Sequence, residues 1–483
     1  MAYAMKRCTL LCPMDSITVS AGAKCLSANI QTVLRCLMQI YGMKAAAREF
    51  YNVFSAHLRS ATTGCNFFQL PSDGCVFVKC VKDGVNVVLS DLKDLAAGNY
   101  DQVMIICLWV DDLMCCFSHQ SMLDELLESF KGKFSYRDEG IWSYLLGMNL
   151  TISDSNADGS YEIRLSHESY FRKFLDSHKA HFKQHPIKTP TKSSNHGLSR
   201  DDCPKSEFEI KGMKDKYSVY RSVLGGLVHI MNWTHPELAY SVSVASMFMS
   251  NPGVTHFAFL MLVLQYCIGV QDKALVFRPW GQKLAEWIGY SDSDYASDES
   301  RRSRTGYCWF FCGNLISWCS KLQHSVTLST AESEYQALCS AAQEMIWLTR
   351  LSAEMGFPSA TTTTLYSDNK ACIAIAHNPV QHKYTKHIDI KLHFIRELIE
   401  RKVVNVVYIE TAANVADIFT KGLSTKLFFK HRDSLFGLRA VGPLSLEAYQ
   451  ITGNLRDHIE LECDELISTE VKGLSCLFQE LMG

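Results

Sequence analysis

The chain has 483 residues, a length at which about two to four domains are expected. Hydrophobic residues make up 47% of it and charged residues 20%, which is the composition of ordinary globular domains. The formal net charge of -2 excludes binding to nucleic acid through overall charge, so such a function has to rest on local basic patches.

Nothing in the sequence indicates secretion or a membrane span. The longest apolar run, Phe257–Val270, contains Gln265 and favours a core helix. The N-terminus has basic residues but no apolar segment followed by a small-residue cleavage site. Many of the 19 cysteines lie in apolar strand-like runs without paired CxxC motifs, which favours reduced thiols. These patterns predict an intracellular protein, cytoplasmic or nuclear, with no membrane role.

The first part of the chain predicts one long helical region and short strands. Residues 1–29 show no clear period and are left unassigned. A helical pattern covers Val33–Leu58 and is interrupted by a turn at Tyr41-Gly42. Short strands are expected at Cys75–Cys80 and Val85–Leu89.

Two adjacent acids follow a continuous apolar strand. Val103–Val110 is apolar throughout, Asp111 and Asp112 follow it, and Leu113–Phe117 is again apolar. This pattern predicts a tight hairpin with two carboxylates at its tip. Because unpaired buried carboxylates are costly, solvent or a metal ion is expected beside them. An ordinary hairpin turn is the alternative, since Asp is a favoured turn residue.

The middle of the chain is mainly helical. Its expected elements are a helix at Ser121–Phe130, strands at Trp142–Ser153 and Tyr161–Leu165, a linker over residues 183–216, helices at Tyr217–Met249 and His256–Ile268, and a strand at Leu275–Phe277. The linker is assigned because Lys, Ser, Pro and Asp replace apolar periodicity there.

A polar stretch with four acids, residues 289–307, lies between two strand-like segments. Apolar, alternating residues lead into it at Tyr290 and out of it at Tyr307–Phe311. Asp292 stands at the end of the first strand, where a carboxylate is poorly placed for a core and well placed to hold a divalent cation. A polar hairpin is the alternative, and matching acids downstream are needed to decide between the two.

The remaining sequence predicts a compact mixed α/β unit. After two strands its expected elements are a helix at Thr330–Met355, a strand at Thr363–Ser367, a helix at Asn369–Ala376, a basic loop, a helix at Lys391–Arg401, a strand at Val403–Ile409 and a helix at Ala413–Lys421. Residues after 435 are acidic and weakly patterned, and they are left unassigned.

Four acids of this unit share one setting, at a strand end or a helix start: Asp292, Glu334, Asp368 and Asp417. Rigid elements can aim such side chains at one point, as an active site requires. Glu332 competes with Glu334 for this role. At about 100° per residue, Glu334 lies nearer the buried stripe of its helix, so Glu332 is expected to support the helix N-terminus.

Carboxylates that converge in one place repel one another unless cations compensate them. Two Mg²⁺ ions about 3.5–4 Å apart, or Mn²⁺ in their place, would resolve this repulsion and create a phosphodiester-cleaving site. Such a site needs no covalent protein nucleophile. Taken singly, each acid could equally be a cap or turn residue, but all four in this order favour the metal site.

The order of these motifs resembles a known family. The segments GYSDSDYA, TGY, ISWCSKLQ, LSTAESEYQAL, YSDNKA, TKHIDIKLHFIRE and NVADIFTK, within residues 285–425, resemble the ribonuclease H domain of copia-type LTR retrotransposon polyproteins. The resemblance implies cleavage of the RNA strand in RNA–DNA hybrids. It also implies that the catalytic metal ligands are Asp292, Glu334, Asp368 and Asp417.

Basic residues of the same region are candidate contacts with nucleic acid. Lys383, Lys386 and His387 lie in or beside the segment similar to the family's TKHIDI, and Arg304 lies in the polar stretch after Asp292. A solvated basic loop is the alternative for the first three residues.

Upstream, the resemblance continues into the reverse transcriptase of the same elements. Residues 41–50, YGMKAAAREF, are similar to the family's YGLKQA segment, and Trp109-Val-Asp-Asp112 resembles its YVDD polymerase motif. Tyr144–Met148 and Tyr220–Glu237 match the connection that follows. The resemblance implies that Asp111 and Asp112 are metal ligands of a polymerase site.

One polymerase ligand is missing from the sequence. The family supplies a further Asp from a strand well before the YGLKQA segment, and nothing before Leu34 fits. Asp15 is the only upstream Asp, and its setting and short distance to Tyr41 are wrong. We therefore predict that this chain does not polymerise DNA.

The predicted fold class is α/β (α+β), with a reverse-transcriptase palm and connection remnant followed by a ribonuclease H-like mixed sheet with flanking helices. The expected domains are an unassigned N-terminus (1–29), a truncated palm and thumb-like region (30–182), a linker and helical connection (183–280), a ribonuclease H-like domain (281–430) and an unassigned tail (431–483). The alternatives to a nuclease are a catalytically decayed nucleic-acid-binding remnant and a scaffold repurposed by the host. The sequence does not indicate an oligomeric state.

Overall fold

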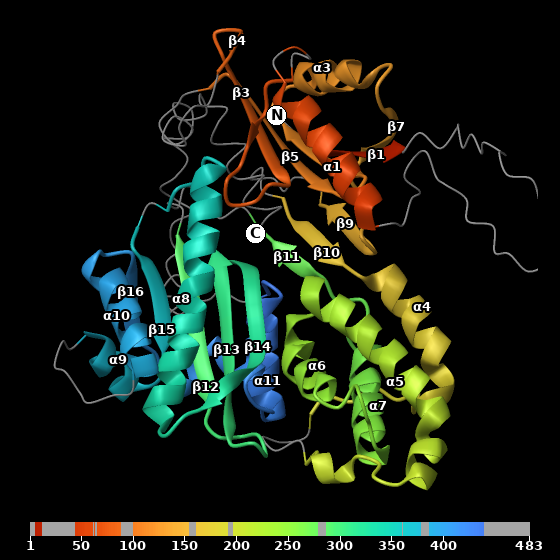
Figure 1. Cartoon of the computed structure of the whole chain (residues 1–483), viewed down its shortest axis with the longest axis vertical. Coiled ribbons are helices and arrows are strands. Elements are labelled where there is room, and N and C mark those ends of the chain that lie inside the picture. Colours follow the sequence, from red (N-terminus) through yellow and green to blue (C-terminus); the bar gives the residue numbers. More distant parts are fainter. Residues whose placement is uncertain are drawn as a thin grey trace, which may run out of the picture. The chain divides into compact units, whose positions relative to one another are not determined.

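A computed structural model describes residues 5–11, 44–60, 62, 65–87, 100–153, 161–191, 197–278, 286–359, 361–377 and 386–438 (Figure 1). These residues form two compact units. The first contains most residues up to Trp142 together with Arg350–Phe357, and the second contains Ser143–Thr349 and the described residues from Pro358 onward. No helix within the described ranges is long and apolar enough to cross a membrane.

The first unit is built on a sheet of seven strands. These are β1 (Met5–Leu11), β2 (Phe68–Gln69), β3 (Val76–Lys82), β4 (Val85–Asn86), β5 (Gln102–Trp109), β6 (Asp112–Phe117) and β7 (Ser135–Ile141), in the order β2-β3-β5-β6-β1-β7 with β4 beside β3. Helices α1 (Lys44–Arg59) and α3 (Gln120–Phe130) share one apolar core with the sheet, to which Phe54 and Phe130 contribute. Burial of these apolar side chains drives the packing.

Most of the expected elements of this unit are confirmed. The apolar strand and its continuation form the β5–β6 hairpin, and the expected helix at Ser121–Phe130 is α3. The expected helix at Val33–Leu58 is described only from Lys44 onward, and its earlier part lies outside the described residues. Strand β1 was not expected from the sequence, and it pairs with both β6 and β7.

The second unit begins with an antiparallel sheet of four short strands. These are β8 (Tyr144–Leu145), β9 (Met148–Ile152), β10 (Ile163–Ser166) and β11 (Leu275–Phe277), in the order β11-β10-β9-β8. The expected single strand at Trp142–Ser153 is therefore wrong, because a tight turn divides it. Leu146 and Gly147 have φ angles of 52° and 85°, the left-handed conformation that two-residue hairpin turns require.

Among the described residues of this unit, four α-helices lie between β10 and β11 in the sequence. They are α4 (Glu168–His178), α5 (Glu207–Trp233), α6 (Ala239–Ser246) and α7 (Val254–Ile268). The expected linker at residues 183–216 is wrong beyond Ser206, where α5 begins with a capping box formed by Ser206 and Glu209. Helix α7 confirms the core helix expected in the longest apolar run.

A five-stranded mixed sheet completes the unit. Its strands are β12 (Trp287–Asp294), β13 (Arg302–Phe311), β14 (Asn314–Val326), β15 (Thr363–Ser367) and β16 (Val404–Tyr408), in the order β14-β13-β12-β15-β16. The β12–β13 and β13–β14 pairs are antiparallel, whereas β12–β15 and β15–β16 are parallel. This mixed sheet confirms the expected α/β class.

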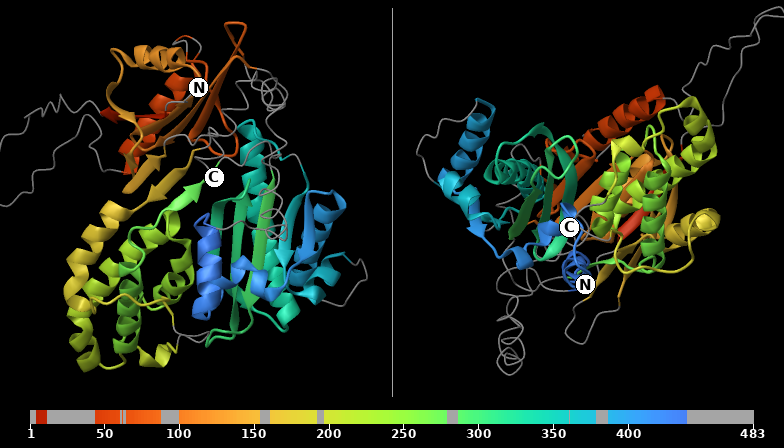
Figure 2. Two further views of the ribbon diagram at one scale, coloured as in Figure 1. Left: turned by 180° about the vertical axis from the view of Figure 1, so that it is seen from behind. Right: turned by 90° about the horizontal axis from the view of Figure 1, so that it is seen from below.

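Helices lie on both faces of this sheet. Helix α8 (Thr330–Glu354) crosses the face seen in Figure 1, and α11 (Thr425–Leu435) lies on the face seen from behind in Figure 2. Helices α9 (Lys370–His377) and α10 (Lys386–Glu400) pack beside β16. Helix α11 was not expected from the sequence.

Helix α8 is fixed to the sheet by a tryptophan. Trp309 of β13 is fully buried, and its Nε1 donates a hydrogen bond to the Ala341 carbonyl of α8 at 3.0 Å. Its ring crosses β12 at Gly289, where a Cβ atom would lie only 2.3 Å from the ring. A glycine is needed there because no larger residue leaves room for the ring.

Candidate metal centre

Asp292 lies within the central strand of the mixed sheet. Strand β12 is bordered by β13 and β15, and Asp292 stands opposite Gly306 of β13. Its side chain is only 1% exposed. The sequence predicted that Asp292 ends a strand, but β12 continues to Asp294. Pairing with Gly306 of β13 fixes the backbone that carries this carboxylate.

Glu334 lies in the first turns of α8, and the start of this helix decides which acid faces the sheet. The Ser329 hydroxyl accepts a hydrogen bond from the Glu332 amide at 3.2 Å, and Glu332 Oε2 accepts one from the Leu328 amide at 2.7 Å. These two bonds have the pattern of a capping box, so Glu332 is occupied at the helix end. Glu334 is 5% exposed and belongs to the acidic group described below.

Three polar side chains join the start of α8 to the sheet. The Ser333 hydroxyl lies 2.8 Å from that of Ser293 on β12. Gln323 of β14 donates from Nε2 to the Ser333 carbonyl at 2.9 Å and to the Thr305 hydroxyl at 3.1 Å. All of these groups are buried, so their hydrogen bonds fix the helix start against the strand that carries Asp292.

Asp368 follows β15 directly and precedes α9. Asn369 Oδ1 accepts a hydrogen bond from the Cys372 amide at 2.9 Å, which caps the first turn of α9. Asp368 is therefore fixed at the junction of a strand and a helix. Because β15 runs parallel to β12, its carboxyl end lies near Asp292.

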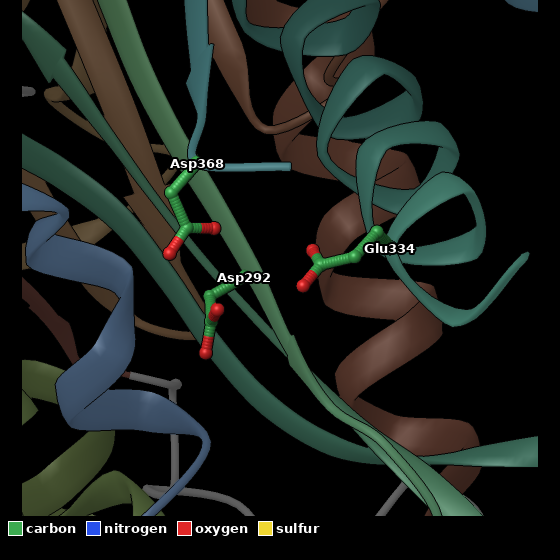
Figure 3. A group of neighbouring side chains, drawn as sticks. All are labelled: Asp292, Glu334 and Asp368. Atoms are coloured by element: carbon green, nitrogen blue, oxygen red, sulfur yellow. The ribbon is translucent and has the colours of Figure 1, made fainter. Parts of the chain in front are cut away.

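These three acids converge. Figure 3 shows the side chains of Asp292, Glu334 and Asp368 turned toward one another, from β12, α8 and the end of β15. One carboxylate oxygen from each lies within 4.8 Å of the others, and no other such acidic, histidine or cysteine group is present in the part of the chain that the structure describes. Hard oxygen ligands in this number suit a divalent cation such as Mg²⁺ or Mn²⁺.

Asp417 reaches the same centre from the other side of β12. The helix expected at Ala413–Lys421 consists instead of two short 3-10 turns, η5 (Thr411–Ala413) and η6 (Val415–Phe419). Asn414 begins η6 by accepting a hydrogen bond from the Ala416 amide at 3.2 Å, and its Nδ2 donates to the Ser291 carbonyl at 3.0 Å. The segment is thereby tied to the residue before Asp292.

Lys421 connects Asp417 with Asp292. Its Nζ lies 3.5 Å from Asp292 Oδ2 and 3.2 Å from Asp417 Oδ1. Thr420 also donates a hydrogen bond from its hydroxyl to Asp292 Oδ2. Sequence reasoning singled out the acids and missed both neighbours, although Lys421 follows Asp417 at the i, i+4 spacing of helical ion pairs.

Gly306 gives the η6 segment room to approach the sheet. A Cβ atom at this position would lie 2.6 Å from Thr420 Cγ2, 2.8 Å from Phe419 Cβ and 3.0 Å from the Ala416 carbonyl. Any side chain at Gly306 would therefore push the segment away from Asp292. The TGY motif thus has a physical role in the centre.

The pKa values of Asp292, Glu334 and Asp417 reflect how close together the acids lie and how deeply they are buried. Burial raises the pKa of Asp292 despite the opposing effects of Lys421 and Thr420. Burial, and then Asp292 and Asp368, raise the pKa of Glu334 well above its usual value. Burial and Asp292 raise the pKa of Asp417 to about 8. The carboxylates therefore resist carrying their charges together unless a cation compensates them.

Glu334 Oε2 is buried and has no hydrogen-bond partner among the described residues. Asp417 Oδ1, by contrast, has the Lys421 ammonium 3.2 Å away. Buried acceptors without donors are costly, and ligation of a divalent cation would satisfy them. The residues present therefore fit a metal ion.

The candidate nucleic-acid contacts are placed differently. Arg304 is 3% exposed, and its Nη1 donates to the Ser243 hydroxyl of α6 at 2.6 Å. Its guanidinium also lies over the Tyr240 ring, 5.4 Å from the centroid. The expectation that Arg304 contacts nucleic acid is therefore wrong, because its polar groups face the interior. Lys383 lies outside the described residues, and Lys386 and His387 are described only as backbone of α10.

The other acidic pair lies at the tip of the β5–β6 hairpin. Trp109 pairs with Asp112, and Asp111 lies half-buried in the turn between them. Strand β1 runs antiparallel beside β6 and brings Thr9 opposite Asp112. Its sequence, MKRCTLL, contains no acid. Within the described ranges, no third acid, histidine or cysteine forms a metal-binding group with Asp111 and Asp112.

Comparison with known proteins gives similar sequences but no match to a family model. The chain is 32% identical over 383 residues to the retrovirus-related Pol polyprotein from transposon TNT 1-94 of Nicotiana tabacum, covering 79% of this chain and 26% of that protein. It is 27% identical over 405 residues to the retrovirus-related Pol polyprotein from transposon RE1 of Arabidopsis thaliana, covering 84% of this chain and 25% of that protein.

A solved structure is also similar to part of the chain. It is the N-terminal RNase H domain of Rv2228c from Mycobacterium tuberculosis, as a fusion protein with maltose binding protein, with 13% identity and a TM-score of 0.22. The match covers 28% of this chain and 95% of that chain.

The strand order and helices of the mixed sheet define an α/β domain. Over about four fifths of its length, the chain is similar to the Pol polyproteins of copia-type retrotransposons. It spans only about a quarter of the length of the curated relatives described above, 26% and 25%.

Proposed function

We propose that this chain is a retrotransposon-derived Pol fragment that hydrolyses the RNA strand of RNA–DNA hybrids. The observation that carries the proposal is the convergence of Asp292, Glu334 and Asp368 in one buried group. We assign this activity to a domain over residues 281–430. Residues 30–182 are assigned to a truncated reverse-transcriptase palm and thumb-like region.

The acids of the centre would hold the metal. Asp292, Glu334 and Asp368 supply one group of oxygen atoms, and Asp417 supplies the fourth carboxylate from η6. Two Mg²⁺ ions, or Mn²⁺, bound here would activate the attacking water and stabilise the leaving oxygen of the phosphodiester. No protein nucleophile is required.

The chain's own residues fix the geometry of this reaction. Asp292 is held by the strand backbone and by the Thr420 hydroxyl, so its carboxylate cannot rotate away from the centre. Glu334 is oriented by the helix start that Ser333 joins to β12. Because these carboxylates are fixed before the substrate arrives, little reorganisation is needed when charge develops on the phosphate.

We infer that the same chain does not polymerise DNA. Asp111 and Asp112 remain at the hairpin tip, but the strand beside them, β1, contains no acid. A polymerase centre requires ligands enough to hold two metal ions against the nucleotide phosphates. Incubation of the full chain with a primed template, deoxynucleotides and Mg²⁺ is expected to leave the primer unextended, and extension would contradict this inference.

The alternative function is a nucleic-acid-binding remnant without catalysis, or a scaffold repurposed by the host. The acid-free strand beside Asp111 and Asp112 favours this alternative, since it leaves the pair without a third acid among the described residues. The two functions share a fold and differ in whether the Asp292 centre is used.

One experiment separates them. The full chain is incubated with an RNA–DNA hybrid labelled on the RNA strand, with Mg²⁺ or with EDTA, beside Asp292→Asn. The matched control is Asp298→Asn in the following loop, where the Asp298 carboxylate accepts hydrogen bonds from the amide and hydroxyl of Ser300. We expect Mg²⁺-dependent cleavage by the wild type and Asp298→Asn and none by Asp292→Asn. Binding without cleavage by the wild type would favour the alternative.

A further inference from the structure

Lys421 places a positive charge beside the acids of the centre. Its side chain is 27% exposed, so most of it is covered by protein while part of it contacts solvent. Its Nζ lies within ion-pair distance of two acids at once, 3.5 Å from Asp292 Oδ2 and 3.2 Å from Asp417 Oδ1. The sequence patterns alone did not predict a role for Lys421.

The ammonium divides the acids into two sets. Asp292, Glu334 and Asp368 form a group whose ligand atoms lie within 4.8 Å of one another, and Asp417 does not belong to it. Lys421 lies between Asp417 and the Asp292 oxygen that also accepts the Thr420 hydroxyl. The first group is therefore available to a cation while the Asp417 side is occupied by the lysine.

An ammonium and a divalent cation cannot share this position. Both would need Asp417 Oδ1 and Asp292 Oδ2 as neighbours, and like charges a few Å apart in a buried site repel strongly. The lysine's long stem allows a solution, because rotation of the side chain moves Nζ toward the solvent that it already contacts.

We propose that Lys421 is a positioning residue that acts as a built-in counter-cation between Asp292 and Asp417, and that a divalent cation gains Asp417 as a ligand only when Lys421 moves away. This inference rests on the proposed metal-dependent function. It predicts two unequal metal sites in the chain without nucleic acid. The stronger site is the group of Asp292, Glu334 and Asp368, and the weaker site requires displacement of the lysine.

Binding of Mn²⁺ to the full chain tests this order directly. Titration calorimetry or the electron paramagnetic resonance of free Mn²⁺ measures the number of ions bound and the affinity of each step. For the wild type we expect one stronger and one weaker step. In Lys421→Met the weaker step should tighten at least tenfold, since no ammonium competes. Lys421→Arg should behave like the wild type because it keeps the charge.

The matched control is Lys426→Met, which removes the same charge from an exposed position five residues further along. It should leave both binding steps within twofold of the wild type. If Lys421→Met binds Mn²⁺ as the wild type does, the proposal is overturned.

Thermal unfolding supplies a second measurement, which separates loss of the counter-cation from a general loss of stability. Without metal, Lys421→Met should unfold at a lower temperature than the wild type, because the carboxylates lose their counter-cation. Saturating Mn²⁺ should remove most of this difference. A deficit of equal size with and without Mn²⁺ would mean that Lys421 only supports the fold, and it would overturn the proposal.

These results also distinguish this inference from the proposed function. If the wild type binds no Mn²⁺ at millimolar concentration, the metal centre itself is refuted. If the wild type binds Mn²⁺ and loses it in Asp292→Asn, but Lys421→Met changes nothing, only the role of Lys421 fails.

Discussion

The hydroxyl oxygen atoms of Ser293 and Ser333 lie 2.8 Å apart, and this contact joins β12 to α8. It lies immediately beside the one acid that each element contributes to the centre. Ser293 follows Asp292 in the sequence, and Ser333 precedes Glu334. The contact is buried, so this short polar link holds the two elements together although the carboxylates of Asp292 and Glu334 repel each other.

Glutamine at Glu334 should separate metal binding from stability. Glu334→Gln replaces a buried carboxylate that lies beside Asp292 and Asp368 with a neutral amide of the same shape, so the metal-free protein should become more stable at pH 8. The affinity for Mn²⁺ should fall at least tenfold. Chemical denaturation and calorimetry measure the two effects.

The control for this change is Glu332→Gln, which removes the same charge two residues earlier. Glutamine can keep the hydrogen bond to the Leu328 amide, so stability should stay within about 0.5 kcal/mol and Mn²⁺ affinity should be unchanged. Loss of Mn²⁺ binding in this control, with none in Glu334→Gln, would reverse the assignment of the two acids.

Alanine at Gly306 should push η6 away from the sheet. Its Cβ would meet Thr420, Phe419 and the Ala416 carbonyl at 3.0 Å or less, so we expect a loss of about 1–3 kcal/mol in the free energy of unfolding, together with weaker Mn²⁺ binding. Gly212→Ala is the matched control in α5, where a Cβ meets nothing within 4 Å. It should stabilise the protein by about 0.5–1 kcal/mol. Equal effects of the two substitutions would refute the packing argument.

Arg304 should matter for folding and not for binding of nucleic acid. Arg304→Met removes hydrogen bonds of a buried guanidinium to Ser243 and Ser320, which should cost about 1.5–3 kcal/mol of stability. Affinity for an RNA–DNA hybrid, measured by fluorescence anisotropy on folded protein, should change less than twofold. Arg302→Met in the same strand removes a more exposed arginine and should cost about 0.5 kcal/mol or less. A large loss of hybrid affinity in Arg304→Met alone would restore the sequence-based expectation.

The metal-free protein should lose stability as the pH rises. The pKa values of Asp292 and Glu334 are raised by burial, and that of Asp417 is raised to about 8. The folded state therefore binds more protons than the unfolded state between the ordinary carboxyl pKa and about 8, so stability is present below that window and is lost through it. Denaturation at pH 5 and pH 8 in EDTA measures the loss. Mn²⁺ should reverse it at pH 8, and a stability that rises with pH in EDTA would contradict this account.

The sequence predicts those parts of the fold that rest on local patterns. The apolar run before Asp111 and the aromatic residues at every second position around Trp309 each predict a strand, because the spacing of apolar residues indicates which side chains are buried. The tight turn at Leu146-Gly147 was missed because its flanking residues continue the strand-like pattern. The start of α5 was missed although Ser206 and Glu209 form a recognisable capping box.

The candidate site was predictable only in its acids. Carboxylates at strand and helix ends can be recognised as motifs in the sequence. The burial of Arg304, in contrast, depends on its contact with Ser243, which lies more than sixty residues earlier. Local sequence patterns do not encode contacts over such a separation. The role of Gly306 depends likewise on the approach of Thr420. Such relationships arise from tertiary packing, so no local pattern of residues encodes them.

The central claim is that Asp292, Glu334 and Asp368 form a divalent-cation centre. Anomalous diffraction from crystals of the full chain grown with Mn²⁺ tests it most directly, because it locates the ion without reference to activity. We predict an anomalous peak in contact with carboxylate oxygen atoms of all three residues, absent in Asp292→Asn. Well-diffracting crystals at millimolar Mn²⁺ with no peak at these side chains would contradict the claim.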